Sequence, residues 1–147
     1  LGVHNRRKSR AGHSLENHLE WIFLENKLQY ERGATTENRA RPDFLFPSGA
    51  SYRNPDFPDS DLIMLGAKTS CKDRWRQILN EAKRIKTKHL LTLQLGLSQD
   101  QLNEMTDASV RLVIPTPLQR WYPAGSTENL RDFIHKLRHK HDSFFLI

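Results

Sequence analysis

The chain has 147 residues, which suits one compact domain. Its single cysteine, Cys71, excludes an intrachain disulfide, so we expect a reducing, cytoplasmic setting. No apolar run approaches the roughly 18 residues that span a membrane, and no segment resembles a signal peptide. Lysine and arginine number 23 against 17 aspartates and glutamates, and the resulting net charge of +6 favours a polyanionic partner such as nucleic acid.

The first third of the chain predicts a basic arm, a helix and a strand. Residues 1–12 are rich in arginine and are expected to form a mobile arm. Apolar residues then recur at helical spacing and predict a helix from about 14 to 28. Polar residues 29–41 predict a loop. Phe44-Leu45-Phe46, followed by Pro47, predicts a buried strand that ends in a turn.

The middle of the chain predicts a loop, a second strand and a second helix. Residues 47–60 carry three prolines and are expected to form a loop. Residues 62–67 are apolar and predict a strand, with Lys68 just beyond it. An amphipathic helix is expected from about 73 to 87. The residues of its apolar face are Trp75, Ile78, Leu79, Ala82 and Ile85.

The last third predicts two strands that alternate with two helices. Residues 89–95 predict the third strand, and residues 110–114 predict the fourth. Between them, Ser98 and Gln101 resemble a capping box that opens a helix reaching about residue 107. A final helix is marked by Leu130, Phe133, Ile134 and Leu137. This order of elements indicates an α/β fold in which helices cover both faces of a mixed sheet.

Three residues could together hydrolyse a phosphodiester. Asp43 begins the first strand, Lys68 ends the second, and Glu81 lies about two turns into the expected helix. Carboxylate oxygens that leave room for water and phosphate suit Mg²⁺, which would stabilise charge on phosphorus and activate water. Lys68 would hold that water or a non-bridging oxygen. The common nuclease pattern places an acid two residues before the lysine, but Gly66 occupies that position, so Glu81 is the candidate for the missing acid.

Two segments carry a resemblance to a known family. They are Pro42-Asp43-Phe44-Leu45-Phe46-Pro47 and the run from Ala67 to Ala82, within which residues 72–77 (Lys-Asp-Arg-Trp-Arg-Gln) are the most specific part. Both resemble the catalytic domain of EcoRII-type restriction endonucleases and their PspGI-like relatives, and residues 12–19 and 89–94 also fit this resemblance. The similarity covers about residues 10 to 135. It implies a PD-(D/E)xK nuclease fold with the acid moved to the helix, so residues 13–147 are expected to form a single catalytic domain.

The resemblance implies a site and an activity. The catalytic residues of the family map onto Asp43, Lys68 and Glu81, with Glu16 on the first helix as a further member, and Asp43 and Glu81 as the metal ligands. The family cleaves double-stranded DNA with Mg²⁺ at sites of the CCWGG type and leaves 5′-phosphate and 3′-hydroxyl ends. Because both strands of a near-palindrome are cut, we expect a homodimer. We expect the chain to be part of a longer protein of a bacterial or archaeal cell, with an N-terminal effector domain as one missing part.

Several further residues are expected to contact DNA. Lys72, Asp73 and Arg74 correspond to the segment that reads C·G pairs, since Lys and Arg donate to guanine and Asp accepts from cytosine. The alternative is that Lys72 and Arg74 bind only phosphates and that Asp73 caps the helix. Tyr52 is the candidate to stack on a base that is flipped out of the duplex, or else a loop residue that covers the core. The candidates for backbone contacts are Arg76, Arg6, Arg7 and Arg10.

Two other functions fit part of this pattern. A non-catalytic DNA-binding module could keep the fold, although it would have no need of Asp43, Lys68 and Glu81 together. A repair-type nuclease of other specificity would share the catalytic residues. The 72–74 cluster favours a restriction enzyme over the repair nuclease, but only through the resemblance.

Overall fold

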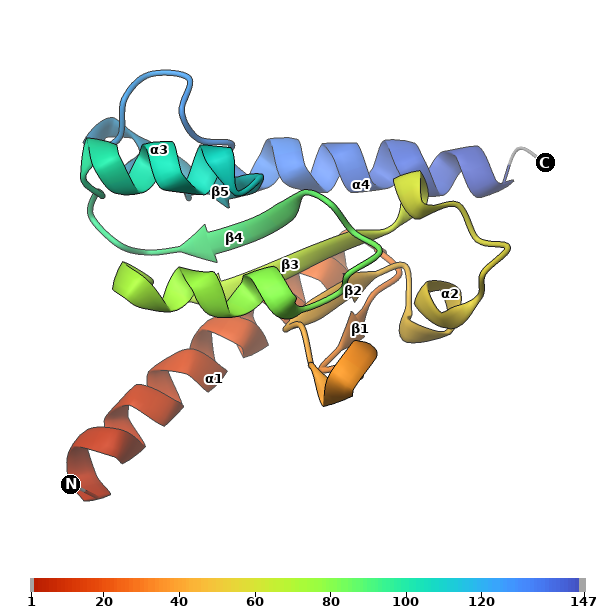
Figure 1. Ribbon diagram of the computed structural model, residues 1–147, viewed down its shortest axis with the longest axis horizontal. Helices are drawn as coiled ribbons and strands as arrows, with labels where there is room; N and C mark the ends of the chain where they lie inside the picture. Colours follow the sequence, from red (N-terminus) through yellow and green to blue (C-terminus); the bar gives the residue numbers. More distant parts are fainter. Residues whose placement is uncertain (1, 146–147) are drawn as a thin grey trace.

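The apolar runs form one mixed sheet. The computed structural model describes residues 2–145, and it describes the side chains of residues 13–72 and 74–140. The sheet has five strands in the order β1-β2-β3-β4-β5 (Figure 1). The strands are β1 (Glu31–Arg32), β2 (Phe44–Phe46), β3 (Ile63–Lys68), β4 (Lys88–Thr92) and β5 (Val110–Val113). The pairs β1–β2 and β2–β3 are antiparallel, whereas β3, β4 and β5 run parallel.

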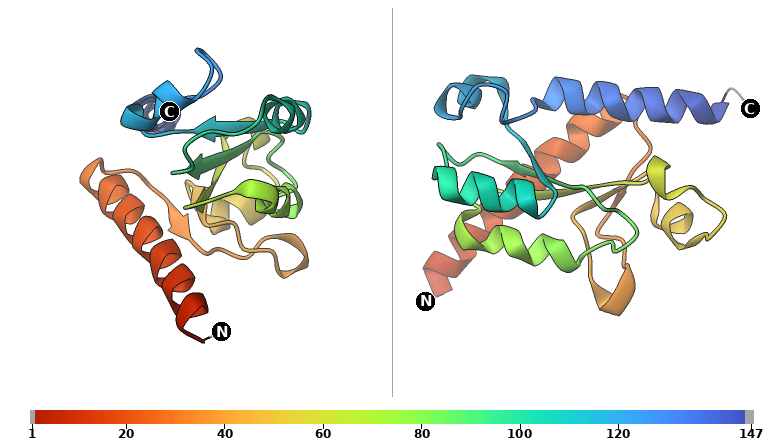
Figure 2. Two further views of the ribbon diagram at one scale, coloured as in Figure 1. Left: turned by 90° about the vertical axis from the view of Figure 1, so that its left-hand side faces the viewer. Right: turned by 45° about the horizontal axis from the view of Figure 1, so that its top comes forward.

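Helices cover both faces of this sheet. The helical segments are α1 (Gly2–Glu25), η1 (Glu37–Arg39), α2 (Gly49–Arg53), η2 (Asp59–Asp61), η3 (Lys72–Asn80), α3 (Gln99–Asp107), η4 (Thr116–Trp121) and α4 (Leu130–Phe145). The views in Figure 2 place α1 and η3 on opposite sides of the strands. Every residue of β4 is buried, as expected for a parallel strand covered on both faces. The predicted α/β architecture is confirmed.

The sheet separates two hydrophobic cores. On one face α1 and α4 contribute Phe23 and Phe133, which meet Phe46 of β2 edge to face, with ring centroids 5.3 and 5.8 Å apart. On the other face Trp75 and Ile78 of η3 pack on the strands, and both are fully buried. Burying aromatic side chains stabilises a fold by roughly 1.5–3 kcal/mol each. These two cores fix the positions of α1 and η3, which carry candidate site residues.

Several boundaries differ from those predicted. The first helix begins at Gly2, so the backbone of residues 2–12, expected to form an arm, continues α1. The expected loop at 29–41 contains β1 and η1, and the expected loop at 47–60 contains α2 and η2. The third strand ends at Thr92 rather than at residue 95. Ser98 does cap α3, because its hydroxyl oxygen accepts from the backbone N–H of Gln101 at 3.2 Å.

The largest correction concerns the segment after Lys68. The expected α-helix over 73–87 is a shorter 3₁₀ helix, η3, which ends at Asn80. Glu81 follows η3 with an extended backbone (φ −91°, ψ 141°), so it lies beyond the helix and not two turns into it. Within residues 2–145, no helix has both the length and the apolar character of a membrane span.

Candidate active site

Strand pairing places Asp43 beside the end of β3. Phe44 is the antiparallel partner of Leu65, so Asp43, one residue earlier, lies next to Gly66 and Ala67. Its carboxylate oxygen Oδ2 accepts a hydrogen bond of 2.8 Å from the backbone N–H of Ala67. The carboxylate is therefore held against the strand that ends in Lys68, as the sequence predicted for two paired strands.

Glu81 approaches the same place from the end of η3. A buried lysine, Lys88, fixes this turn, because its Nζ donates to the carbonyl oxygens of Glu81, Ala82 and Ile85 at 2.6 Å each. These three carbonyls follow the end of η3, and that of Ala82 also accepts from the backbone N–H of Ile85 at 2.9 Å, so the ammonium group holds the turn together. The backbone of Glu81 is thus extended and is held in place by the tertiary contact with Lys88, and its side chain reaches the site from there.

The charges of Asp43, Lys68 and Glu81 interact. Burial, followed by the negative charge of Asp43, raises the pKa of the Glu81 carboxyl to about 7. Lys68 acts in the opposite direction on the same group, as does Lys88. The structure therefore brings together the three residues that the sequence separates by up to 38 positions, counting from Asp43 to Glu81.

Glu16 joins this group from the middle of α1. Burial, then the negative charge of Asp43, raises the pKa of the Glu16 carboxyl, and a hydrogen bond between the two carboxyl groups adds to this effect. Positive charge from Arg32 and His13 opposes it. Glu16 Oε1 lies 3.8 Å from Arg32 Nε of β1, which ties α1 to the edge of the sheet. All four predicted catalytic residues consequently meet at one end of β3.

Packing explains why no acid stands at residue 66. A Cβ atom added to Gly66 would lie 3.1 Å from Cγ2 of Ile78 and 3.9 Å from Oδ2 of Asp43. Ile78 is fully buried in the core beneath η3, so it has little freedom to move away. The usual position of the second acid is therefore filled by core packing, and Glu81 supplies a carboxylate from the turn that follows η3.

The oxygen donors fit a hard divalent cation. Among the described residues, no group of three or more His, Cys, Asp and Glu side chains already surrounds a metal position. Asp43 and Glu81 instead offer two carboxylates whose mutual repulsion raises the pKa of Glu81. Mg²⁺ is commonly bound by one or two carboxylates, with water and phosphate oxygens as its other ligands. The donor set suits Mg²⁺ in this respect.

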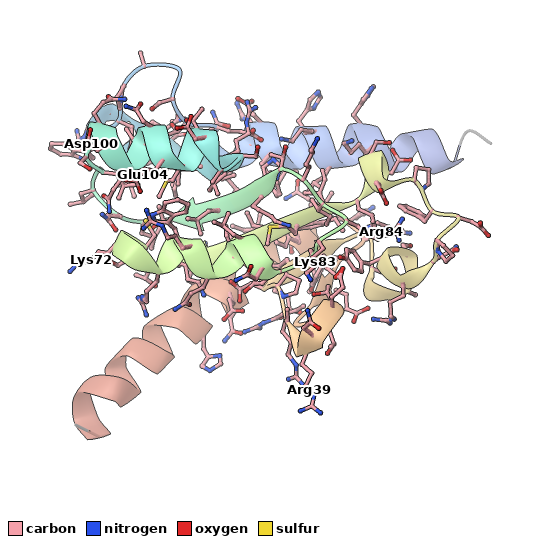
Figure 3. The ribbon with its side chains drawn as sticks, in the orientation of Figure 1. Arg39, Lys72, Lys83, Arg84, Asp100 and Glu104 are labelled. Carbon is pink, nitrogen blue, oxygen red and sulfur yellow. The ribbon has the colours of Figure 1, made fainter. Side chains whose placement is uncertain are left out.

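The segment expected to read DNA begins η3 and is exposed. Lys72 has a positive φ of 31°, and its side chain extends outward from the start of η3 (Figure 3). The side chain of Arg74 is exposed, and its Nη2 donates to the carbonyl oxygen of Ser70 at 3.1 Å. The side chain of Asp73 lies outside the described residues. Because Cys71 is the N-cap of η3, Asp73 lies inside this helix and does not occupy the capping position.

A residue without a sequence signal, Gln94, organises this segment. Its side-chain oxygen Oε1 accepts from the backbone N–H groups of Cys71 and Lys72, both at 3.1 Å. It also lies 3.4 Å from the hydroxyl of Ser70. The sequence places Gln94 at the end of an expected strand and of a segment, residues 89–94, that shares the family resemblance, but nothing there predicted this role. One carboxamide therefore holds the turn that connects Lys68 to the 72–74 segment.

Tyr52 is not placed for base stacking. Its side chain belongs to the core beneath η3, only 3% of the residue is exposed, and its hydroxyl is bonded to the Glu37 carboxylate and to Arg84 N–H. Burial and the hydrogen bond to Glu37 raise the pKa of this phenol to about 12. The expectation of a flipped-base pocket at Tyr52 is not supported, and the alternative of a core-covering tyrosine fits the structure.

The arginines proposed for the DNA backbone divide into two groups. Arg76 forms an ion pair with Glu104 of α3 and lies over the ring of Trp75, with 4.6 Å from Cζ to the ring centroid. About half of the Arg76 side chain remains exposed (53%), so it stays accessible to a phosphate. Arg6, Arg7 and Arg10 belong to α1, but their side chains lie outside the described residues.

Comparison of the sequence with known proteins points to one family. The family model described as EcoRII C terminal matches residues 1–134. A type II restriction enzyme, EcoRII of Escherichia coli, is 55% identical over 122 residues, which is 82% of this chain and 30% of the relative. The chain thus spans under a third of that enzyme.

Solved structures support the fold. Metal-depleted Ecl18kI in complex with uncleaved, modified DNA superposes with a TM-score of 0.85 at 20% identity, over 97% of this chain and 50% of the other. A second structure, metal-depleted Ecl18kI in complex with uncleaved DNA, gives a TM-score of 0.81 at 19% identity, over 95% of this chain and 48% of the other. The restriction-endonuclease-like fold predicted from the sequence is confirmed.

Proposed function

Since the chain belongs to the EcoRII C-terminal family of restriction endonucleases, we propose that it is a Mg²⁺-dependent domain that cleaves double-stranded DNA. The target is a short site of the CCWGG type, and the products carry 5′-phosphate and 3′-hydroxyl ends. The observation that carries this proposal is the convergence of Asp43, Lys68, Glu81 and Glu16 at the end of β3. A domain that only binds DNA has no use for like charges held this close.

Each residue has a role that its surroundings support. Asp43 and Glu81 would hold Mg²⁺, which supplies a Lewis acid for the scissile phosphate and lowers the pKa of a water molecule. Lys68 contributes a positive charge beside both carboxylates, where it holds a non-bridging phosphate oxygen or orients that water. Glu16 faces Asp43 from α1 and, through Arg32, is anchored to β1. The hydrogen bond from Ala67 N–H keeps Asp43 in a fixed direction.

The exposed start of η3 would select the site. Lys72 and Arg74 supply donors for guanine, and Asp73 supplies an acceptor for cytosine. These residues follow Lys68 by four to six positions, so base reading and cleavage are joined through one short turn. A homodimer would place two such segments on the two halves of a near-palindrome. Arg76 and the arginines of α1 would contact the phosphate backbone.

The rival function is DNA binding without cleavage. It deserves a direct test because the chain covers 30% of the EcoRII relative, so activity could require a part of the protein that lies elsewhere. A repair-type nuclease of other specificity is the second rival. Both rivals predict a different result from the same digestion experiment.

The experiment is digestion of plasmid DNA with CCWGG sites by the purified chain, with Mg²⁺ or with EDTA, followed by sequencing of the ends. We expect Mg²⁺-dependent cleavage confined to one site type. Lys68→Ala should lower the rate by at least about 100-fold, since an electrostatic catalytic group contributes roughly this much. Lys83→Ala, which removes an exposed lysine after η3, is the matched control and should cleave at the wild-type rate.

The outcomes separate the three functions. Binding to the site without cleavage in Mg²⁺ or Mn²⁺ would indicate the binding module. Cleavage without a preferred sequence would indicate a repair-type nuclease. Wild-type rates in Lys68→Ala would refute the assignment of the site.

A further inference from the structure

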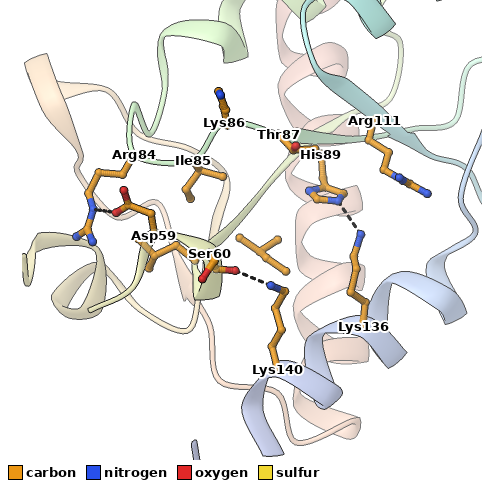
Figure 4. Close-up of a pocket in the computed structure, with 12 residues that line it drawn as sticks. Asp59, Ser60, Arg84, Ile85, Lys86, Thr87, His89, Arg111, Lys136 and Lys140 are labelled. Carbon is orange, nitrogen blue, oxygen red and sulfur yellow. Dashed lines mark hydrogen bonds and ion pairs between the residues drawn. The ribbon is translucent and has the colours of Figure 1, made fainter. Parts of the chain in front are cut away.

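A second cationic site lies outside the catalytic group. A cavity of about 480 Å³ opens at the amino ends of the parallel strands, between α4 and the loop that leads from η3 to β4 (Figure 4). Six of its lining residues carry basic side chains: Arg84, Lys86, His89, Arg111, Lys136 and Lys140. Figure 4 shows Lys136 directed from α4 toward His89 of β4, and Lys140 directed toward Ser60 of η2, whose carbonyl oxygen accepts from Lys140 Nζ at 2.5 Å. Nothing in the proposed cleavage reaction uses these residues.

The strand register separates this cavity from the active site. His89 pairs with Leu65 and Arg111, whereas Lys68 pairs with Thr92, three residues further along each strand. Three residues correspond to about 10 Å along a strand. The ring of His89 packs against Phe133 of α4, with centroids 5.1 Å apart, so His89 lies on the α1–α4 face of the sheet. Gly66 faces Ile78, on the η3 face of the sheet. Lys68 is two residues further along the same strand, so it lies on that face as well.

The positive charge of the cavity is only partly neutralised. The carboxylate of Glu128 accepts from Arg111 Nε at 2.7 Å and from Lys136 Nζ at 3.2 Å. Asp59 pairs with Arg84 at 2.7 Å. Leaving Lys140 aside, four lysines and arginines against these two carboxylates leave an excess of two positive charges. Lys86 is exposed and has no ion-pair or hydrogen-bond partner among the described side chains.

The buried histidine adds a neutral group to this cluster. Burial, followed by the charges of Lys136, Arg111 and Lys140, lowers the pKa of His89 to about 3. The imidazole therefore stays neutral. Because the ammonium group of Lys136 can only donate, Nε2 of His89 is the acceptor in the 2.9 Å hydrogen bond between them. Lys136 is thus oriented by His89 and Glu128 together. The cavity has a fixed cationic wall beside the exposed Lys86.

We propose that this cavity is a binding site for a phosphate group. A phosphate monoester carries a charge near −2 and several acceptor oxygens, which matches the excess positive charge and the separate donors on α4, β5 and the loop before β4. The volume is within the range of small-molecule sites and exceeds what a lone carboxylate would occupy. The phosphate belongs either to a small phosphate ester such as a nucleotide, or to the backbone of DNA bound away from the scissile bond. The site does not depend on the proposed cleavage.

The first test uses small phosphates. Pyrophosphate and ATP are titrated calorimetrically into the chain in EDTA, so that the carboxylate site takes no part. We expect saturable binding, weakened about tenfold by Lys86→Gln and more by Lys86→Gln combined with Lys140→Gln. Arg131→Gln removes an exposed cation from the same helix, α4, outside this cavity, and should bind as the wild type does. Thermal unfolding of each variant verifies that the fold is intact.

The second test distinguishes the two sources of the phosphate. Binding of a duplex without any CCWGG sequence is measured against salt concentration, again in EDTA. If DNA supplies the phosphate, Lys86→Gln should reduce the slope of log affinity against log salt by about 0.9, whereas Arg131→Gln should not. Binding of pyrophosphate or ATP with an unchanged slope would assign the site to a small phosphate ester. Equal binding by all variants in both tests would overturn the proposal.

Discussion

The carboxyl group of Glu81 lies where its ionisation is unfavourable. Its pKa is raised from 4.5 to about 7 by burial and by Asp43, so the folded protein binds this proton more tightly than the unfolded chain does. The contribution of this carboxyl group to the free energy of unfolding should therefore fall as the pH rises from 4.5 to 7. Glu16, whose pKa is also raised, changes stability in the same direction. Two acids of the site thus oppose folding at neutral pH.

The variant Glu81→Gln tests whether the ionised carboxylate of Glu81 destabilises the folded protein. In EDTA, the stability of the wild type relative to the variant should fall by up to about 3 kcal/mol between pH 4.5 and 8, because an amide does not ionise, whereas the lowered pKa of His89 affects both proteins equally. At pH 8 the variant should be the more stable protein although it no longer cleaves DNA. Urea unfolding between pH 4.5 and 8 measures the difference. Glu25→Gln, at an exposed glutamate of α1, serves as the control, and equal pH profiles for all three proteins would contradict the prediction.

Metal binding by the same residues gives a separate prediction. Mg²⁺ held by Asp43 and Glu81 would bind the folded chain only, so it should raise the thermal midpoint of the wild type at pH 8. The rise should be absent in Glu81→Gln. A Mg²⁺ effect of equal size in both proteins would place the metal elsewhere.

At the scale of the elements, the turn between β3 and η3 connects the candidate catalytic residue Lys68 to the segment proposed to read DNA. Gln94, just beyond β4, holds this turn through the N–H groups of Cys71 and Lys72. Without that acceptor both N–H groups lose their partner, which costs roughly 1–3 kcal/mol when the groups are buried. The positions of Lys72 and Arg74 would then be less well defined relative to Lys68.

Gln94→Leu should therefore lower discrimination more than it lowers stability. We expect the ratio of kcat/KM on a CCWGG duplex to that on a duplex with one mismatched pair to fall by about tenfold, equivalent to roughly 1.4 kcal/mol. Gln99→Leu is the matched control, because the side chain of Gln99 bonds only to Asn103 on the surface of α3. Equal ratios for the two variants would show that Gln94 does not position the segment.

The sequence predicted four of the strands because each is a buried apolar run. β1 was missed, since Glu31 and Arg32 carry no apolar signal and their strand is defined by backbone pairing with β2. The helix after Lys68 was predicted too long, because the buried positions Ala82 and Ile85 continue the helical spacing past its end. Lys88 holds the turn beyond that helix by bonding the carbonyl oxygens of Glu81, Ala82 and Ile85, and periodicity contains no sign of such a tertiary contact.

The candidate catalytic residues were easier to identify from the sequence than the residues that support them. Asp43, Lys68 and Glu81 have charges and spacings that point to one chemistry, and the resemblance added Glu16. Gln94 acts through a neutral side chain that makes its contacts only in the folded chain. Tyr52 was expected to stack on a base only through the resemblance, with a core-covering tyrosine as the alternative, and the short helix α2 turns it into the core.

At the scale of the whole molecule, the proposed function requires two copies on one DNA site. Lys68→Ala should bind a duplex with a single CCWGG sequence as two chains per duplex. Sedimentation velocity with labelled DNA measures this stoichiometry, and a duplex without the sequence provides the comparison. One chain per duplex at saturation would contradict the homodimer and would indicate cleavage of the strands in separate events.

The contact between Gly66 and Ile78 also bears on how this site can change over evolutionary time. Restoring an acid at residue 66 would force a side chain to within 3.1 Å of a fully buried isoleucine, so a single substitution there would damage the core before it helped catalysis. Shrinking Ile78 first would leave a cavity, with a loss of roughly 2–5 kcal/mol for a change to alanine. Whichever of the two residues is substituted first, the intermediate protein is less stable than the present one. The relocated acid is thus protected by a packing barrier, and descendants of this chain should keep Glu81 even where their target sequences diverge.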